Sequence, residues 1–377
     1  MVSKYVRALA LRVVYHVQQK LPDLHGQPTR TLVMMISAFI AGGGPWLSTM
    51  GRTLVDLPGS LQEKVKRMSR FLCQSRFEVR EAFTAYARGI LETIAHAHPH
   101  RMIVVAWDWT DLGDFQGLWL SIPYHGRALP LGCWVLEKAF SEGSMTPVEQ
   151  EMIRAFLDAL PESLRRRVVV LADRGFAKSE LMAELSERQV HWVIRQPRSH
   201  KICQEGLWRA LSEIPLGPGE DLFLRHVRCI QDSPLPVQLA CRRLPVGKAN
   251  DPDDDTWYLA TDVDDFKQAV SWYTLRFQIE EMFRDLKSRL HMDEHRLGTE
   301  EGVAKMMLIV ALAYLIVLED GTQWRSRVTL ERIQKTTARG KLSVYSIAQA
   351  CFAACLPEAP SEVCDLIVAR WSNLRAA

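Results

Sequence analysis

The sequence predicts an α/β protein, in which helices flank a mixed β-sheet. Residues 102–136 contain three segments of β-branched and apolar residues separated by polar turns, a pattern typical of strands. Helical and strand patterns then alternate as far as residue 195, as expected for a sheet that is covered by helices. Residues 272–287 contain no glycine or proline and have helical periodicity, which adds a long helix after the sheet.

Composition limits the class of protein. A chain of 377 residues with 47% hydrophobic residues can bury the cores of two or three domains. The net charge is only +3, so any surface that binds nucleic acid must be local. The eight cysteines form no Cys-x-x-Cys pair, which favours reduced thiols and no zinc site. No secretory signal is expected, and the apolar runs at 32–41 and 306–318 are too short to cross a bilayer, so we expect two buried helices there.

The first hundred residues are expected to be helical. Three short amphipathic segments, separated by glycine and proline, cover Arg30–Ile40, Leu47–Val55 and Ser60–Cys73. Cations gather in and beside the last two segments: Arg52, Lys64, Lys66, Arg67, Arg70 and Arg76. Short helices with clustered cations are typical of a helix-turn-helix-like DNA-binding domain, although any small helical bundle has the same pattern.

Two aspartates follow predicted strands of the sheet. The strand Met102–Ala106 leads to Asp108, and the wholly apolar strand Val168–Ala172 leads to Asp173. Ligands gather at strand ends in such sheets, so both residues are candidate site residues. An aspartate at a strand end can also be a turn former or a helix cap.

The other elements of this region complete the alternation. Thr146 is expected to cap a helix over Thr146–Leu160, with Glu149 as the partner in a capping box. The remaining predicted elements are strands at Leu118–Pro123, Leu129–Leu136 and His191–Arg195 and a helix at Ser179–Arg188.

A β-rich segment precedes the long helix. Strand patterns cover Leu222–Cys229, Pro236–Arg242 and Trp257–Thr261, and after the long helix come an apolar helix at Glu301–Leu318 and a basic helical tail at Leu330–Arg375. We therefore divide the chain into a helical N-terminal domain (1–100), the first part of the core (101–195), a β insertion (196–265), the second part of the core (266–323) and a C-terminal tail (324–377).

The long helix has an unusual polar stripe. At 3.6 residues per turn, one side carries Tyr273, Arg276, Glu280, Arg284 and Lys287. Arg276 and Glu280 have the i,i+4 spacing of a surface ion pair, which would explain the stripe without any function. Alternatively, the carboxylate holds a divalent metal ion and the neighbouring cations bind phosphate.

Three sequence blocks together resemble a known family. Tyr273, Arg276, Glu280 and Lys287 match the signature Tyr, two residues, Arg, three residues, Glu, six residues, Lys. The blocks Asp108-Trp109-Thr110 and Asp173-Arg174-Gly175-Phe176 are similar to those around the other two acids of that family. The chain therefore resembles the DDE transposases of the bacterial insertion-sequence-four group. This resemblance implies an RNase H-like fold with an inserted β subdomain.

The resemblance also implies a metal site. Asp108, Asp173 and Glu280 would be catalytic residues and ligands of two Mg²⁺ ions, which Mn²⁺ can replace, with Asp108 shared by both ions. Oxygen ligands and a pair of ions suit phosphodiester cleavage. Asp111 and Asp114 follow Asp108 closely and Glu281 follows Glu280, so all three compete for the role. Asp111 is expected to point to the face opposite Asp108, and Glu281 lies off the stripe, which makes these two weaker candidates.

Further residues are implied to bind DNA. Tyr273, Arg276 and Lys287 would bind phosphates near the cleavage site. Trp257 matches the aromatic of the β insertion that stacks on a flipped base in this family, although it could be a buried strand residue. Arg174 and Arg284 either bind phosphate or neutralise the acids.

The function expected from the resemblance is cut-and-paste DNA transposition. The protein would bind the inverted repeats of a transposon, pair the ends as a homodimer and cleave them through hairpin intermediates. It would then join the ends to target DNA. We expect it in the bacterial cytoplasm, associated with the nucleoid and with no membrane partner. The alternatives are an inactive DNA-binding or regulatory relative, and an RNase H-like nuclease outside transposition.

Overall fold

The computed structural model describes most of the chain from residue 27 to residue 327. The described residues are 13–15, 17–18, 21, 27–42, 44–54, 57–74, 77–138, 145–229, 235–246, 255–327 and 345. The predicted helical tail, apart from residue 345, lies outside the described residues.

An eight-stranded sheet forms the centre of the molecule. Its strand order is β3-β2-β1-β4-β5-β10-β9-β8, and β1, β4 and β5 are parallel whereas the other pairs are antiparallel. Its strands are β1 (Ile103–Leu112), β2 (Phe115–Tyr124), β3 (Arg127–Glu137), β4 (Val168–Ala172), β5 (His191–Arg195), β8 (Asp221–Val227), β9 (Val237–Arg243) and β10 (Thr256–Thr261). This confirms the predicted fold, an RNase H-like mixed sheet flanked by helices.

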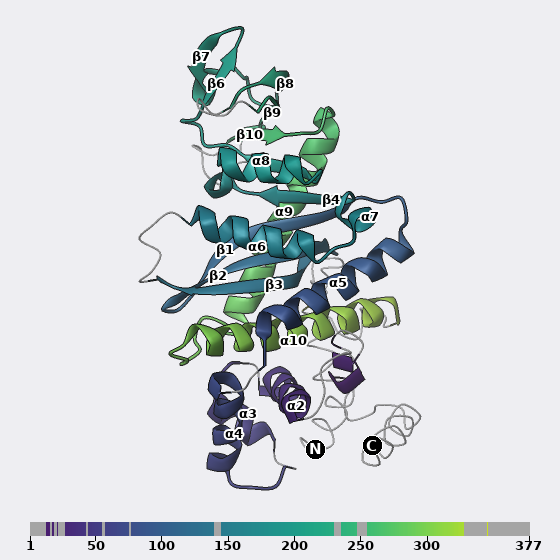
Figure 1. Cartoon of the computed structure of the whole chain (residues 1–377), viewed down its shortest axis with the longest axis vertical. Helices are drawn as coiled ribbons and strands as arrows, with labels where there is room; N and C mark the ends of the chain where they lie inside the picture. The colour runs from purple at the N-terminus through teal and green to yellow at the C-terminus, as the bar shows by residue number, and fades with distance from the viewer. Residues whose placement is uncertain are drawn as a thin grey trace.

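Helices cover both faces of the sheet (Figure 1). The helix α9 (Phe266–Ser288) crosses one face and contacts strands from β3 to β9. Its first turn is capped by the Asp265 carboxylate, which accepts a hydrogen bond from the Gln268 backbone N–H at 3.0 Å. The opposite face carries α6 (Thr146–Asp158), α7 (Glu162–Arg165) and α8 (Ser179–Glu187).

The predicted β insertion is largely part of the same sheet. The strand β10 pairs with β5, and β9 and β8 extend the sheet beyond it, while β6 (Lys201–Gln204) and β7 (Leu207–Ala210) form a separate hairpin. Trp257 on β10 is therefore held in the continuous sheet that carries Asp108 and Asp173. The division of the chain into five parts stays a prediction.

A buried helix joins the N-terminal helices to the sheet. The helix α10 (Glu300–Arg327) packs on β3 and also contacts α2 (Gln27–Gly42), α4 (Leu61–Gln74) and α5 (Val79–Ala97); α3 (Leu47–Thr53) lies between α2 and α4. Residues 300–319 are long and apolar enough to cross a membrane by composition, but 94% of their most apolar window is buried inside the protein. The expected buried helix is thus present.

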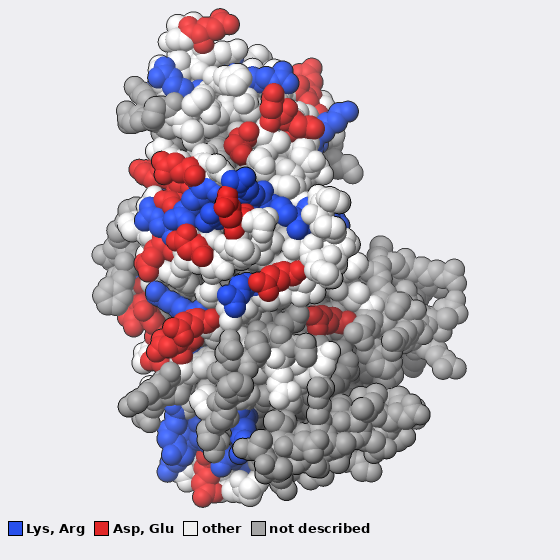
Figure 2. Space-filling view, turned by 45° about the vertical axis from the view of Figure 1, so that its right-hand side comes forward, with Lys and Arg blue, Asp and Glu red and all other residues white. Residues whose placement is uncertain are grey.

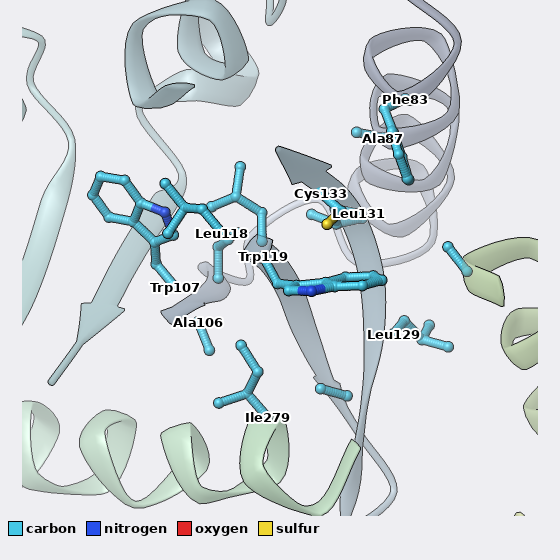
Figure 3. Close-up of a cluster of buried hydrophobic side chains, with 14 of the residues drawn as sticks. Phe83, Ala87, Ala106, Trp107, Leu118, Trp119, Leu129, Leu131, Cys133 and Ile279 are labelled. Carbon is cyan, nitrogen blue, oxygen red and sulfur yellow. The ribbon is translucent and has the colours of Figure 1, made fainter. Parts of the chain in front are cut away.

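Large apolar side chains pack on both faces of the sheet (Figure 3). Trp107 and Trp119 are fully buried, and Phe83 of α5 belongs to the same core. On the side of α9, Ile279 points toward Ala106 of β1. Because Ile279 precedes Glu280 and Ala106 lies two residues before Asp108, this packing holds α9 close to the strand that carries Asp108.

Two local predictions are wrong. Asp108 does not end its strand: β1 continues to Leu112, because Asp108 pairs with Trp119 in the β1–β2 hairpin. Only the parallel pairing of β1 with β4 ends at residue 107. Glu149 does not complete a capping box, since Met145 is the N-cap and makes no side-chain cap; the Glu149 side chain is buried instead.

Candidate active site

Strand alternation brings two acids to the face of the sheet that α9 covers. Val169 and Leu171 of β4 pack against the first turns of α9, so Asp173, two residues further, lies on the same side. Val104 of β1 also packs there, and Asp108 follows it at an even spacing. Glu280 approaches from α9 itself. We call Asp108, Asp173 and Glu280 the acid cluster.

Arg276 lies between members of the acid cluster. Its Nη1 donates a hydrogen bond of 3.1 Å to Oδ2 of Asp108, and its Nη2 pairs with Oε1 of Glu280. The side chain of Arg276 is only 13% exposed, whereas that of Glu280 is 42% exposed. Both sequence interpretations of Glu280 therefore have support: it makes the i,i+4 ion pair, and it lies next to another acid of the cluster.

The electrostatics of Asp108 reflect this crowding. Burial raises the pKa of Asp108 to about 7, the Arg276 charge opposes the rise, and the charges of Asp173 and Glu280 add to it. Burial by itself would lower the pKa of Arg276, but the interactions with Tyr273 and with all three acids outweigh it and raise the pKa above its usual value. The three carboxylates are therefore close enough to interact, and one arginine balances them.

The acid cluster is not assembled as a metal site. Among the residues that the structure describes, no three acidic, histidine or cysteine side chains lie close enough together to hold one ion. The donor set nevertheless fits a hard divalent cation, because it offers carboxylate oxygens from three elements in a place that already attracts positive charge. For an ion to bind Asp108, the guanidinium of Arg276 has to move away from it.

Tyr273 lies beside the acid cluster with an unused donor. The residue is buried, and burial raises the pKa of its hydroxyl. Its hydroxyl makes no hydrogen bond of normal geometry to the described residues. The ring of Trp257 packs edge-on against the Tyr273 ring, with centroids 5.3 Å apart. Trp257 is half-buried beside Tyr273, and this position suits both base stacking and packing within the sheet.

The other predicted DNA-binding residues differ in their surroundings. Lys287, in the last turn of α9, is half-buried and has no ion-pair partner in the described part of the chain. Arg284 is exposed and pairs with Glu281, so it does not neutralise the acid cluster. Arg174 is exposed directly after Asp173.

Two of the competing acids make ion pairs outside the acid cluster. Glu281 pairs with Arg127 at 2.8 Å and is 12% exposed. Asp111 pairs with Lys138 at 3.0 Å. Asp114 lies in the β1–β2 turn, where its backbone carbonyl accepts a hydrogen bond from the Lys138 N–H.

Sequence reasoning missed two residues at the site. Arg195 follows the residue of β5 that pairs with Ala172, so it lies beside Asp173, and its charge lowers the pKa of Tyr273. Phe277 lies three residues before Glu280 on α9, and it is 51% exposed. Strand alternation could have identified Arg195, since Val193 faces α9.

A buried polar network fixes the far end of α9. Asp285 is 2% exposed and accepts hydrogen bonds from Arg127 of β3 at 2.6 Å and from the Tyr314 hydroxyl of α10 at 3.1 Å. Arg127 also binds Glu281, one turn earlier. Because these contacts fix the rotation of α9, they hold Arg276 and Glu280 toward the sheet.

A basic surface lies far from the acid cluster. Lys66, Arg67 and Arg70 are exposed on α4, and Arg70 lies about one turn beyond the other two. Figure 2 shows Lys and Arg interspersed with Asp and Glu across the middle of the molecule, and a further group of Lys and Arg at its lower end, where Figure 1 places α2–α4.

A comparison with protein families supports the resemblance to DDE transposases in general. The family model described as "Transposase DDE domain" matches residues 145–316. The match contains Asp173 and the whole of α9 with Glu280, and it begins after Asp108. A search among curated proteins finds no match.

Proposed function

Because this chain belongs to the DDE transposases, we propose that it is a cut-and-paste transposase of the insertion-sequence-four type. It would cleave DNA at transposon ends and join the ends to target DNA. The observation that carries the proposal is the position of Arg276 between Asp108 and Glu280, with Asp173 in electrostatic reach. Three carboxylates gathered around one cation are suited to exchange that cation for divalent metal ions.

DDE transposases use divalent metal ions, and we assign Asp108, Asp173 and Glu280 as the ligands of two Mg²⁺ ions, with Asp108 shared. When bound, such ions activate the attacking oxygen and stabilise the leaving oxygen. Asp108 must lose its proton to ligate, and Arg276 must release it. The released guanidinium then becomes available to a phosphate, for which its forked geometry is well suited.

Residues around the acid cluster would hold the scissile strand. The unused Tyr273 hydroxyl can donate a hydrogen bond to a phosphate oxygen, and Arg195 adds a charge on the same side of the sheet. Lys287 lies two turns of α9 beyond Glu280, about 10 Å along the helix axis, and would bind the next phosphates.

Hairpin formation on the excised end requires a base to leave its stack. Two aromatic residues are candidates to receive it: Trp257 beside Tyr273, and the exposed Phe277 on α9. Stacking on either ring would contribute about 1–3 kcal/mol per base.

The remaining parts of the proposal concern binding and assembly. The exposed cations of α4 would bind the terminal inverted repeats, and Arg174 and Arg284 would bind backbone phosphates near the cut. A homodimer would pair the two ends, and the protein would act in the bacterial cytoplasm at the nucleoid.

Cleavage of end-bearing DNA in Mg²⁺ or Mn²⁺ tests the proposal. Asp108→Ala, Asp173→Ala and Glu280→Ala should each abolish nicking while shifting end DNA as the wild type does. Asp111→Ala is the matched control, because Asp111 pairs with Lys138 and not with Arg276. A wild type that shifts DNA without nicking it would be a regulatory relative. One that nicks DNA but fails in a strand-transfer assay would be a nuclease of another kind.

A further inference from the structure

A buried carboxylate lies behind the acid cluster, on the opposite face of the sheet. Glu149 of α6 is 2% exposed. Its Oε1 accepts a hydrogen bond of 3.0 Å from the indole Nε1 of Trp109, and its Oε2 pairs with the Nζ of Lys178. A buried carboxylate is costly unless both of its oxygens have partners, and Glu149 meets that condition with two residues from different elements.

The two partners of Glu149 each belong to a segment that carries one acid of the cluster. Trp109 follows Asp108, and its backbone N–H donates a hydrogen bond of 2.9 Å to the Asp108 carboxylate. Lys178 is the N-cap of α8 and closes the short segment that begins at Asp173. Glu149 therefore links the position of Asp108 to that of Asp173 from behind.

Strand pairing joins these two segments to each other only as far as the residues before the acids, although β1 itself stays paired with β2 as far as Leu112. The parallel pairing of β1 with β4 ends at Trp107 and Ala172, one residue before each acid. Beyond that point Asp173 forms a tight turn, in which its Oδ1 accepts the Gly175 N–H at 2.8 Å. The Glu149 contacts thus set the spacing of the two chains where the parallel ladder no longer does.

We propose that Glu149 is a positioning residue, which sets the separation of the Asp108 and Asp173 carboxylates for divalent metal binding. This inference rests on the proposed function, because it takes both aspartates as metal ligands. Glu149 lies on the α6 side of the sheet and does not touch substrate. Its effect on the metal is transmitted through Trp109 and Lys178.

Metal binding without DNA tests the inference directly. Mn²⁺ alone is titrated into the protein and followed by calorimetry or by the electron spin resonance of free Mn²⁺. Glu149→Gln keeps the shape of the side chain but removes the charge that Lys178 needs, and Trp109→Phe removes only the indole donor. We expect both variants to weaken Mn²⁺ binding by about tenfold, the lower end of the effect of residues that orient metal ligands.

End-DNA binding and the thermal unfolding midpoint are measured on the same samples. Glu184→Gln is the matched control: Glu184 is 12% exposed and holds α8 to α6 through Arg154, away from both aspartates. This variant should unfold at a lower temperature and bind Mn²⁺ as the wild type does. End binding should stay within about twofold for all three variants, since none of these side chains is in the proposed DNA-binding set.

Three outcomes would overturn the inference. Unchanged Mn²⁺ affinity in both folded variants would remove the positioning role. Equal weakening by Glu184→Gln would show that α6 docking in general, and not Glu149, is responsible. If Glu149→Gln does not fold, unchanged Mn²⁺ affinity in Trp109→Phe overturns the inference by itself. If the Asp108→Asn variant binds Mn²⁺ as tightly as the wild type does, the proposed metal site itself would be contradicted.

Discussion

The guanidinium of Arg276 donates a 3.1 Å hydrogen bond to the carboxylate of Asp108, although 168 positions separate the two residues in the chain. The same guanidinium pairs with Glu280. Without an ion, the positive charge among the acids is thus supplied by the protein, and an arriving metal ion must compete with it.

Because Arg276 and a metal ion would compete for Asp108, we predict opposite effects of Arg276→Ala on metal binding and on cleavage. Removal of the guanidinium should tighten Mn²⁺ binding by about tenfold, because a hydrogen bond between charged groups, worth about 1.5–3 kcal/mol, no longer has to be broken. The same variant should cleave DNA much more slowly, since it loses a phosphate contact. Mn²⁺ titration and a nicking assay measure the two effects, and weaker Mn²⁺ binding would contradict the competition.

The pKa of Asp108 predicts the pH dependence of metal binding. With a pKa of about 7, raised mainly by burial, the carboxyl is mostly protonated at pH 6 and mostly ionised at pH 8. A ligand must be deprotonated, so Mn²⁺ displaces one proton at low pH, and its affinity should rise roughly tenfold per pH unit below 7 and level off above it. Titrations at pH 6, 7 and 8 measure this. A constant dissociation constant over that range would exclude Asp108 as a buried ligand.

Lys287→Ala tests the phosphate contact at the end of α9. The variant should bind end DNA more weakly and lower the slope of log K against log salt by about one. Lys267→Ala is the control, because Lys267 is exposed at the other end of the helix, about 30 Å away along its axis. Equal slopes for wild type and Lys287→Ala would rule out the contact.

The two aromatics near the acid cluster can be separated by their burial. Phe277 is 51% exposed, so Phe277→Ala should leave stability nearly unchanged. Trp257 packs on Tyr273, so Trp257→Ala should destabilise the fold as well. The fluorescence of 2-aminopurine at the transposon end reports base extrusion. Its loss in Phe277→Ala alone assigns stacking to α9, its loss in Trp257→Ala alone assigns stacking to β10, and its survival in both variants contradicts stacking on either ring.

The network at Asp285 predicts a large effect on stability. Asp285→Ala leaves Arg127, only 13% exposed, without its closest carboxylate, and should cost roughly 3–5 kcal/mol in the free energy of unfolding. Glu151→Ala breaks the exposed pair with Arg80 and should have no measurable effect. Urea unfolding measures both, and similar midpoints would show that Asp285 is not a structural anchor.

Much of the fold could be predicted from local sequence pattern. The β5 strand His191–Arg195 matches its prediction at both ends, and Asp173 directly follows β4 as expected, because a wholly apolar run bounded by polar residues is unambiguous. The end of β1 could not be predicted in this way. Its last residues mix Trp109 and Asp111, and they stay extended only because β2 pairs with them.

Features of the site that depend on tertiary contacts could not be predicted. Glu149 has the sequence position of a capping residue, but it is buried because it binds Trp109 and Lys178, which lie elsewhere in the chain. Phe277 is a large apolar residue, yet it faces outward on α9 because Ile279 and Met282 occupy the sheet side. The position of Arg276 between two acids required the packing of α9 across β1.

The buried helix α10 has a consequence for where DNA would be cut. It touches α2 and α4 on one side and β3 on the other, so it connects the basic end of the molecule to the sheet that carries Asp108. DNA gripped by α4 would then meet the acids at a set number of base pairs from its bound sequence. In this way the length of α10 would set the distance along the DNA between the recognised sequence and the position of the cut.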